Sequence, residues 1–98
     1  MTEPDGLIHQ AVRLKIMASL NAARASALDF NRLKALTGAT DGNLGAHLAT
    51  LESAGYVRIE KRIVGKRPRT EATITRAGER AFHAHVEFLR EVIDGAQD

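Results

Sequence analysis

Two short stretches of this 98-residue chain carry side chains that could bind a polyanion. Residues 40–50 are rich in small and polar residues, whose amide and hydroxyl groups can hydrogen-bond the edges of nucleic-acid bases. Residues 65–69 place Lys66, Arg67 and Arg69 at a turn, from which long cations can reach phosphates without leaving water. The two stretches together predict double-stranded DNA as the partner, with these cations on its phosphates or in its minor groove.

The charge of the chain is concentrated around the second stretch. The net charge is only +2, but residues 58–76 contain seven basic and two acidic side chains, which leaves −3 for the remainder. Such a distribution concentrates positive potential on one edge and suits a polyanion that is met on one face. The alternative is a charged hairpin that is solvated and contacts nothing.

The residue types used in catalysis or metal binding form no recognisable pattern. His83 and His85 lie two positions apart in a predicted helix and so point to different sides, whereas joint metal ligation needs a spacing of three or four. We interpret them as interface or surface residues. Because the chain also lacks cysteine, a serine–histidine–carboxylate arrangement and a phosphate-binding glycine loop, we expect no enzyme, no cofactor and no metal.

Length and hydropathy indicate one domain inside the cell. No apolar run approaches the roughly 18 residues needed to span a bilayer, and the acidic residues 1–5 are unlike a basic signal peptide. The absence of cysteine agrees with a reducing compartment. We therefore expect residues 1–98 to form a single cytoplasmic domain without membrane contact.

The spacing of hydrophobic residues predicts three helices in the first half of the chain. The first is expected to start after Pro4, with Asp5 as its N-cap, and to reach about Asn21; a small strand is expected at residues 25–28. The second helix is expected to have Asp29 as its N-cap and to end at Gly38. The third is expected to have Thr40 as its N-cap and to end at Gly55.

Beyond residue 55 the hydrophobic period changes from helical to two, which predicts a hairpin. Gly65 and Pro68 mark its tip, and Thr75 is expected to cap a last helix of about residues 76–94. The predicted fold is mainly α with a small β wing, in the order helix, helix, helix, hairpin, helix. This order is that of a winged helix-turn-helix.

The third helix, about residues 40–54, is the predicted recognition helix. Leu44, Leu48 and Leu51 form a single buried stripe, which leaves a small polar face outward. Gly42 and Gly45 each cost about 1 kcal/mol relative to alanine, so close approach to DNA or to a neighbouring helix is a reason to keep them; ordinary surface is the alternative reading of this face. The predicted DNA contacts are Thr40, Asp41, Gly42, Asn43, Ala46, His47 and Thr50, together with Lys66, Arg67 and Arg69 of residues 64–70.

The last helix carries more hydrophobic residues than one core face needs. Its predicted core stripe is Phe82, Val86, Leu89 and Ile93, beside which Phe88 and Val92 form a second stripe. A second stripe on a terminal helix predicts packing against the same helix of a two-fold mate, with help from the first helix. The predicted dimer interface consists of Leu7, Ile8, His85, Phe88, Leu89 and Val92.

Several motifs in their observed order resemble the small stand-alone winged-helix transcriptional regulators related to the MarR and ArsR groups. These motifs together span nearly the whole chain. They are residues 9–17, residues 30–34, the sequences TDGNL and HL within residues 40–48, the sequence LESAGYV at residues 51–57 and the sequence TITRAG at residues 73–78. The resemblance implies a dimeric prokaryotic DNA-binding regulator. Two departures are the missing cysteine motif for metal sensing and Ala11, where a proline is common.

These observations predict a sequence-specific, duplex-DNA-binding transcription regulator that acts as a homodimer. The alternative from another class is a winged-helix module for protein–protein interaction, since the fold alone does not fix function. Such a module would not need clustered cations, and its third helix would expose larger apolar side chains. A small-molecule effector could bind between the first and last helices, but no polar cluster in the sequence identifies one.

Overall fold

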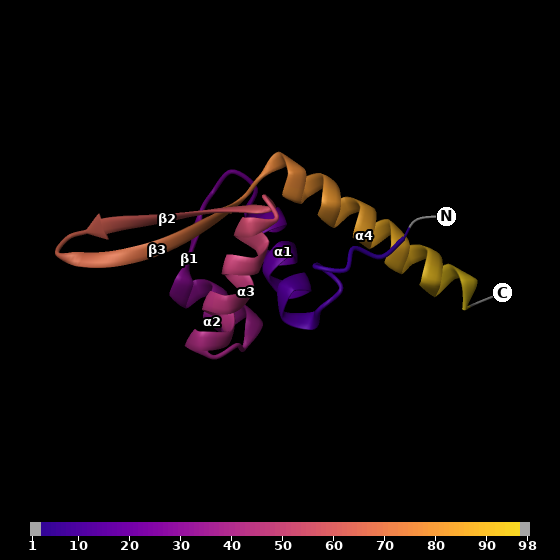
Figure 1. Cartoon of the computed structure of the whole chain (residues 1–98), viewed down its shortest axis with the longest axis horizontal. Helices are drawn as coiled ribbons and strands as arrows, with labels where there is room; N and C mark the ends of the chain where they lie inside the picture. The colour runs from indigo at the N-terminus through magenta and orange to yellow at the C-terminus, as the bar shows by residue number, and fades with distance from the viewer. Residues whose placement is uncertain (1–2, 97–98) are drawn as a thin grey trace.

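The computed structural model describes residues 3–96, and this range forms four helices and a small three-stranded sheet (Figure 1). The arrangement confirms the predicted winged helix-turn-helix. The hairpin and the last helix project from opposite sides of the body, so the molecule is elongated, with extents of 57 × 25 × 21 Å. The elements are α1 (Ala11–Ala23), β1 (Leu28–Asp29), α2 (Phe30–Thr37), α3 (Asp41–Ser53), β2 (Val57–Val64), β3 (Arg67–Ile74) and α4 (Arg76–Gly95).

Side-chain caps fix the starts of α2, α3 and α4, as the sequence predicts. The side chains of Asp29, Thr40 and Thr75 each accept a hydrogen bond from a backbone N–H three residues later, at 2.7, 3.2 and 3.0 Å. Gly38 and Gly55 follow α2 and α3 with φ of +72° and +79°, a left-handed conformation that ends a helix at little cost in glycine.

The predicted start of α1 at Asp5 is wrong. The carboxylate of Asp5 caps a separate turn, because it accepts hydrogen bonds from the backbone N–H groups of Leu7 (2.9 Å) and Ile8 (3.0 Å). Gln10 caps α1 itself, and Ala11 is the first helical residue. This is the position at which proline is favoured in helices, so the alanine found there changes only the helix start.

The sheet has the order β1-β3-β2, with both neighbouring pairs antiparallel. β2 and β3 pair over their full length, from Val57 opposite Ile74 to Val64 opposite Arg67, and this long hairpin is the wing. Its tip is the two-residue turn Gly65–Lys66, where Gly65 has a φ of +67°. Pro68, predicted to mark the tip, lies instead within β3 and opposite Ile63.

The core lies where α1, α2 and α3 meet the base of the wing. The predicted stripe Leu44, Leu48 and Leu51 of α3 is buried there, together with residues of α1 such as Ile16 and Leu20. No helix within residues 3–96 combines the length and the apolar character needed to cross a membrane.

The predicted core stripe of α4 is correct only in its first half. Phe82 is buried and Val86 packs on the core, but Ile93 is 57% exposed. The reason is that the C-terminal part of α4 extends beyond the helices that cover its first turns (Figure 1). His85, predicted at an interface or on the surface, is fully buried.

His85 holds the segment before α1 against α4. Its Nδ1 accepts a hydrogen bond from the backbone N–H of Asp5 (3.1 Å), and its ring stacks on Phe88 at a centroid distance of 5.8 Å. The carboxylate of Asp5 also accepts a hydrogen bond from the Tyr56 hydroxyl (2.7 Å). Because Nδ1 accepts, the ring proton of neutral His85 belongs on Nε2, which is buried and without a hydrogen-bond partner in residues 3–96.

This arrangement predicts that acid destabilises the fold. Burial lowers the pKa of His85 below its usual 6.5, the nearby His9 lowers it further, and Asp5 opposes the shift. The unfolded chain therefore binds the proton more readily, so the contribution of His85 to stability is complete above pH 6.5 and is lost as the pH falls through the lower folded pKa. The expected slope for this residue is at most about 1.4 kcal/mol per pH unit.

Urea unfolding of the wild type and of His85→Phe at pH 8, 6 and 5 measures this contribution. The variant should lose less stability than the wild type between pH 8 and 5. Parallel losses in the two proteins would contradict the assignment. At still lower pH a second loss is expected from Asp5: burial raises the pKa of this carboxyl, but hydrogen bonds from Tyr56, Ile8 and Leu7 bring it below its usual 3.8.

Candidate nucleic-acid interface

The exposed face of α3 is smooth, because four of the eight residues exposed on this helix are glycine or alanine. Gly42 and Ala46 are exposed as predicted, Gly45 is exposed as well, and the structure adds two exposed small residues that were not predicted: Ala49 and Ser53. Gly42, Ala46, Ala49 and Ser53 lie on the side of the helix opposite the buried leucines, and Gly45 lies on the flank of that side. The helical spacing of Ala49 and Ser53 from Gly42 is the sequence signal that identifies them.

The two glycines of α3 are not required by packing within the chain. A Cβ atom built at Gly42 or Gly45 would meet nothing within 4 Å, and neither residue has a positive φ. Close approach of a neighbouring helix, one of the two explanations from the sequence, is therefore wrong. Two explanations remain: a partner approaches the α3 backbone from outside, or this face is ordinary surface.

Polar groups flank this smooth face at the start and along one side of α3. Thr40 serves as the N-cap, and Asn43 is exposed in the first turn. Thr50 is half-buried, and its hydroxyl donates to the carbonyl of Ala46 (3.1 Å), which leaves its methyl group and the acceptor side of the hydroxyl for a contact. Asp41 forms an ion pair with Lys34 of α2 (2.7 Å), which reduces its repulsion of an anion.

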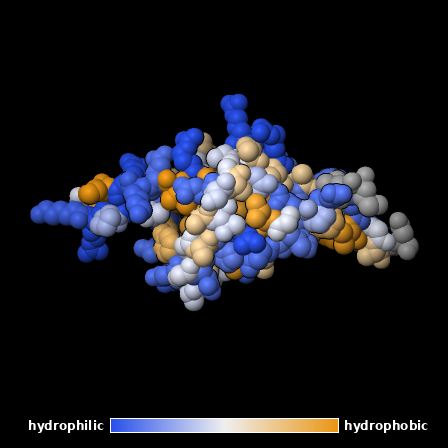
Figure 2. Space-filling view, viewed as in Figure 1, coloured by the Kyte–Doolittle hydropathy of each residue, from blue (hydrophilic) through white to orange (hydrophobic). Residues whose placement is uncertain are grey.

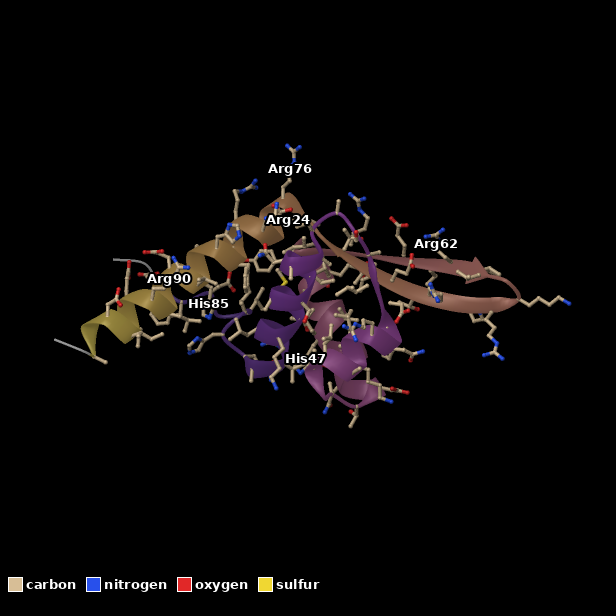
Figure 3. All side chains as sticks on the ribbon, turned by 180° about the vertical axis from the view of Figure 1, so that it is seen from behind. Arg24, His47, Arg62, Arg76, His85 and Arg90 are labelled. Carbon is tan, nitrogen blue, oxygen red and sulfur yellow. The ribbon has the colours of Figure 1, made fainter. Side chains whose placement is uncertain are left out.

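His47 faces α1 more than the exposed face of α3. Its Nδ1 lies 3.0 Å from Nη1 of Arg13, and because arginine can only donate, Nδ1 accepts in this contact. Arg13 also donates from Nε to the carbonyl of Leu7, so one side chain joins the N-terminal segment, α1 and α3. Figure 3 shows His47 beside the lower end of α1. Arg13 was not predicted as a site residue, and no sequence signal distinguishes it.

The wing carries both free and paired cations. Within residues 3–96 no carboxylate pairs with Lys66 or Arg67 at the tip, and both are exposed. Arg69 is different, because its guanidinium lies 3.9 Å from carboxylate oxygens of both Asp29 and Glu71. Arg62 also pairs with Glu71, at 3.1 Å. The strongest positive potential is therefore expected at the tip rather than along the whole wing.

The predicted dimer residues divide into three groups. Ile8 and His85 are fully buried within the chain, so neither can offer its side chain to a second copy, and these two assignments are wrong. The turn capped by Asp5 places Ile8 in the core, and contacts with Asp5 and Phe88 enclose His85. Leu7, Phe88 and Leu89 are half-buried, and Val92 is 52% exposed.

Two of the hollows on the described surface involve α2. One of about 410 Å³ separates the distal wing from the start of α2, and the other, of about 420 Å³, lies between α1 and α2. Neither corresponds to the effector cleft expected between the first and last helices. No three histidine, aspartate or glutamate side chains within residues 3–96 come together as a metal site.

The helix-turn-helix, the smooth face of α3 and the basic wing tip define a winged-helix DNA-binding protein. The chain belongs to the family described as winged helix DNA-binding domain, whose model matches residues 12–93.

Known proteins are similar to this chain over most of its length. A curated but uncharacterized protein of Methanocaldococcus jannaschii is 36% identical over 80 residues, which cover 82% of this chain and 85% of that protein. The structure of a transcriptional regulator homologue from Pyrococcus horikoshii OT3 is 33% identical, with a TM-score of 0.83 and coverage of 92% and 87%. A MarR-family regulator structure from Enterococcus faecalis V583 shares the fold, with 24% identity, a TM-score of 0.77 and coverage of 93% and 80%. The resemblance to winged-helix transcriptional regulators is confirmed.

Proposed function

We propose that the chain is a sequence-specific transcription regulator that binds duplex DNA as a homodimer. In this proposal α3 enters the major groove, and the basic wing, residues 64–70, contacts the backbone or the minor groove. The observation that carries the proposal is the pair of glycines in α3 that no contact within the chain requires. They allow the helix backbone to approach the floor of a groove.

Sequence specificity is assigned to the groups around that smooth face. The exposed amide of Asn43 can make two hydrogen bonds to an adenine edge, and the methyl group of Thr50 can contact a thymine methyl. His47 has a smaller role than the sequence predicted, because Arg13 already occupies its Nδ1. Lys66 and Arg67 hold phosphates and supply affinity without reading sequence.

The homodimer is assigned to the distal half of α4. Val92 and Ile93 are exposed there, next to the half-buried Leu89, and Figure 2 shows hydrophobic surface at this end of the molecule. The same segment of a second copy would cover these side chains through a two-fold contact. Two recognition helices would then meet successive major grooves, with half-sites roughly 10 base pairs apart or at a multiple of that spacing.

Selection of binding sites from random duplex DNA tests the proposal. A two-fold symmetric consensus is the expected product, and it would establish specificity and symmetry together. A pool that enriches no sequence would contradict the proposal. If the chain enriches no duplex but binds another protein, the result would favour the protein–protein interaction module considered above.

The glycines of α3 provide a sharper test, because stability and binding should change in opposite directions. An alanine side chain at Gly42 or Gly45 would have open space around it and a better helix propensity. The free energy of unfolding of each variant should therefore be about 0.5–1 kcal/mol higher than that of the wild type. Each should also bind the selected duplex at least about tenfold more weakly if the added methyl group keeps the backbone from the groove.

Ala49→Gly is the matched control, because it makes the same face smaller. It should cost about 1 kcal/mol of stability and leave the affinity for DNA nearly unchanged. Denaturant unfolding and fluorescence anisotropy on one preparation measure both properties. Stabilised glycine variants that bind DNA as well as the wild type would disprove the close approach of α3.

A further inference from the structure

The wing ends in hydrophobic residues that the core does not use. Ile63 is 77% exposed, the most of any large hydrophobic residue that the structure describes, and Val64 is 45% exposed. Pro68 lies directly opposite Ile63 on the other strand. Ile63 and Pro68 share one face of the hairpin and form the wing-tip patch, whereas Val64 belongs to the opposite face. Figure 2 shows hydrophobic surface surrounded by hydrophilic surface at this end of the molecule.

The position of Ile63 in the strand explains why the core does not cover it. Side chains alternate along a strand, so Val57, Ile59 and Ile63 share one face of β2. Val57 is buried and Ile59 packs on the core, but Ile63 lies four residues further on, roughly 13 Å at the usual rise of a strand. At this distance the hairpin has left the body of the molecule (Figure 1).

The charges around the wing-tip patch indicate what kind of partner could cover it. Residues 61–70 contain no acidic side chain. The basic side chains in this range are Lys61, Arg62, Lys66, Arg67 and Arg69. Protein interfaces are depleted in lysine but not in arginine. Burying five cations against an uncharged surface would, however, remove their hydration without supplying any counter-charge. A polyanion with apolar surface between its phosphates could pair with the cations of the tip and cover its hydrophobic residues at the same time.

We propose that the wing-tip patch is an apolar contact for the DNA minor groove, which deepens the proposed function and rests on it. Ile63 and Pro68 contact sugars and base edges inside the groove, and Lys66 and Arg67 bind the phosphates along its rims. Isoleucine and proline are among the apolar side chains that proteins place in the minor groove.

The dimensions of the wing agree with this contact. The minor groove is about 6 Å wide, which is too narrow for a two-stranded ribbon, so the side chains at the tip would enter it rather than the strands. The minor groove next to a recognition helix lies about half a helical turn away, roughly 17 Å. The part of the hairpin beyond Ile59 is of similar length, at five to seven residues with a rise of about 3.3 Å each.

Two single variants separate the apolar contact from the electrostatic one. Ile63→Ala should weaken binding to the selected duplex about tenfold at every salt concentration, because it removes apolar contact and no charge. Lys66→Ala should instead reduce the slope of log affinity against log salt by about 0.9. Leu36→Ala, at another exposed hydrophobic residue outside the wing, is the control and should change neither quantity.

Base substitution locates the contact. Replacing G·C by inosine·C pairs beside each half-site removes the guanine amino group from the minor groove and leaves the major-groove edge unchanged. The wild type should gain affinity from this change, and Ile63→Ala should gain less than half as much on a logarithmic scale.

The proposal and the proposed function can fail separately. Equal affinities of the wild type and Ile63→Ala would overturn the minor-groove contact and leave binding by α3 intact. Ile63→Ala could also leave the DNA affinity unchanged but alter dimerisation, measured by sedimentation, or binding to vesicles that contain phosphatidylserine. Either result would overturn the minor-groove contact in favour of a protein or membrane contact. A wild type that enriches no duplex would overturn both.

Discussion

Gly78→Ala should destabilise the protein by about 3 kcal/mol or more, although alanine is the better helix former. A Cβ atom at Gly78 would lie 2.1 Å from the carbonyl oxygen of Tyr56 and 2.9 Å from its carbonyl carbon. This carbonyl accepts the backbone N–H of Thr75 (3.1 Å), so it cannot move without disturbing the start of α4. In a domain of this size the melting temperature should fall by roughly 15–20 °C.

The variants at Gly42 and Gly45 are the natural comparison, because the chemical change is the same and the expected sign is opposite. Thermal and urea unfolding of the three variants under one condition measure the difference. A Gly78→Ala protein as stable as the wild type would show that α4 can shift away from Tyr56, and that the close contact is not a constraint on the fold.

Ile93→Glu should convert the proposed dimer into a folded monomer. Ile93 is 57% exposed within one chain, so the substitution leaves the core intact, but in a seam between two copies it would bury a charge. Phe88, which the sequence also placed in the interface, is a poorer position for this charge, because its ring packs on His9 and His85 of its own chain. Operator affinity should fall about a hundredfold or more, since each half-site must then be bound independently.

Ala84→Glu is the matched control for this charge. Ala84 is exposed and lies half a turn around α4 from Ile93, so the variant should remain dimeric and bind DNA normally. Sedimentation at tens of micromolar gives the oligomeric state, and anisotropy gives the affinity. A monomeric wild type, or a dimeric Ile93→Glu protein, would refute the seam along α4.

The local features of the fold could be predicted because they depend on neighbouring residues. An N-cap such as Asp29 or Thr40 needs only a backbone N–H three residues later, and a glycine stop needs only its own freedom in φ. The hairpin followed from an alternation of residue types that is independent of the rest of the chain. These features were sufficient to predict the winged helix-turn-helix.

The errors arose where distant segments meet. Asp5 and His85 are 80 residues apart, and nothing in the local sequence indicates that a backbone N–H of one meets a ring nitrogen of the other. The hydrophobic periodicity of α4 predicted a buried face that includes Ile93. It could not show that the other helices cover only the first turns of α4. The role of Gly78 is similarly hidden, because the carbonyl that excludes a side chain there belongs to Tyr56.

The outward projection of the wing has a consequence for how much DNA the protein would occupy. One chain is 57 Å long, and the wing and the exposed end of α4 lie at opposite ends of it. A dimer joined through α4 would therefore carry its wings at its two outer limits. The length of one chain corresponds to roughly 17 base pairs at 3.4 Å each. A nuclease footprint would accordingly extend well beyond the two half-sites, and neighbouring operators could be filled together only if their outer flanks did not overlap.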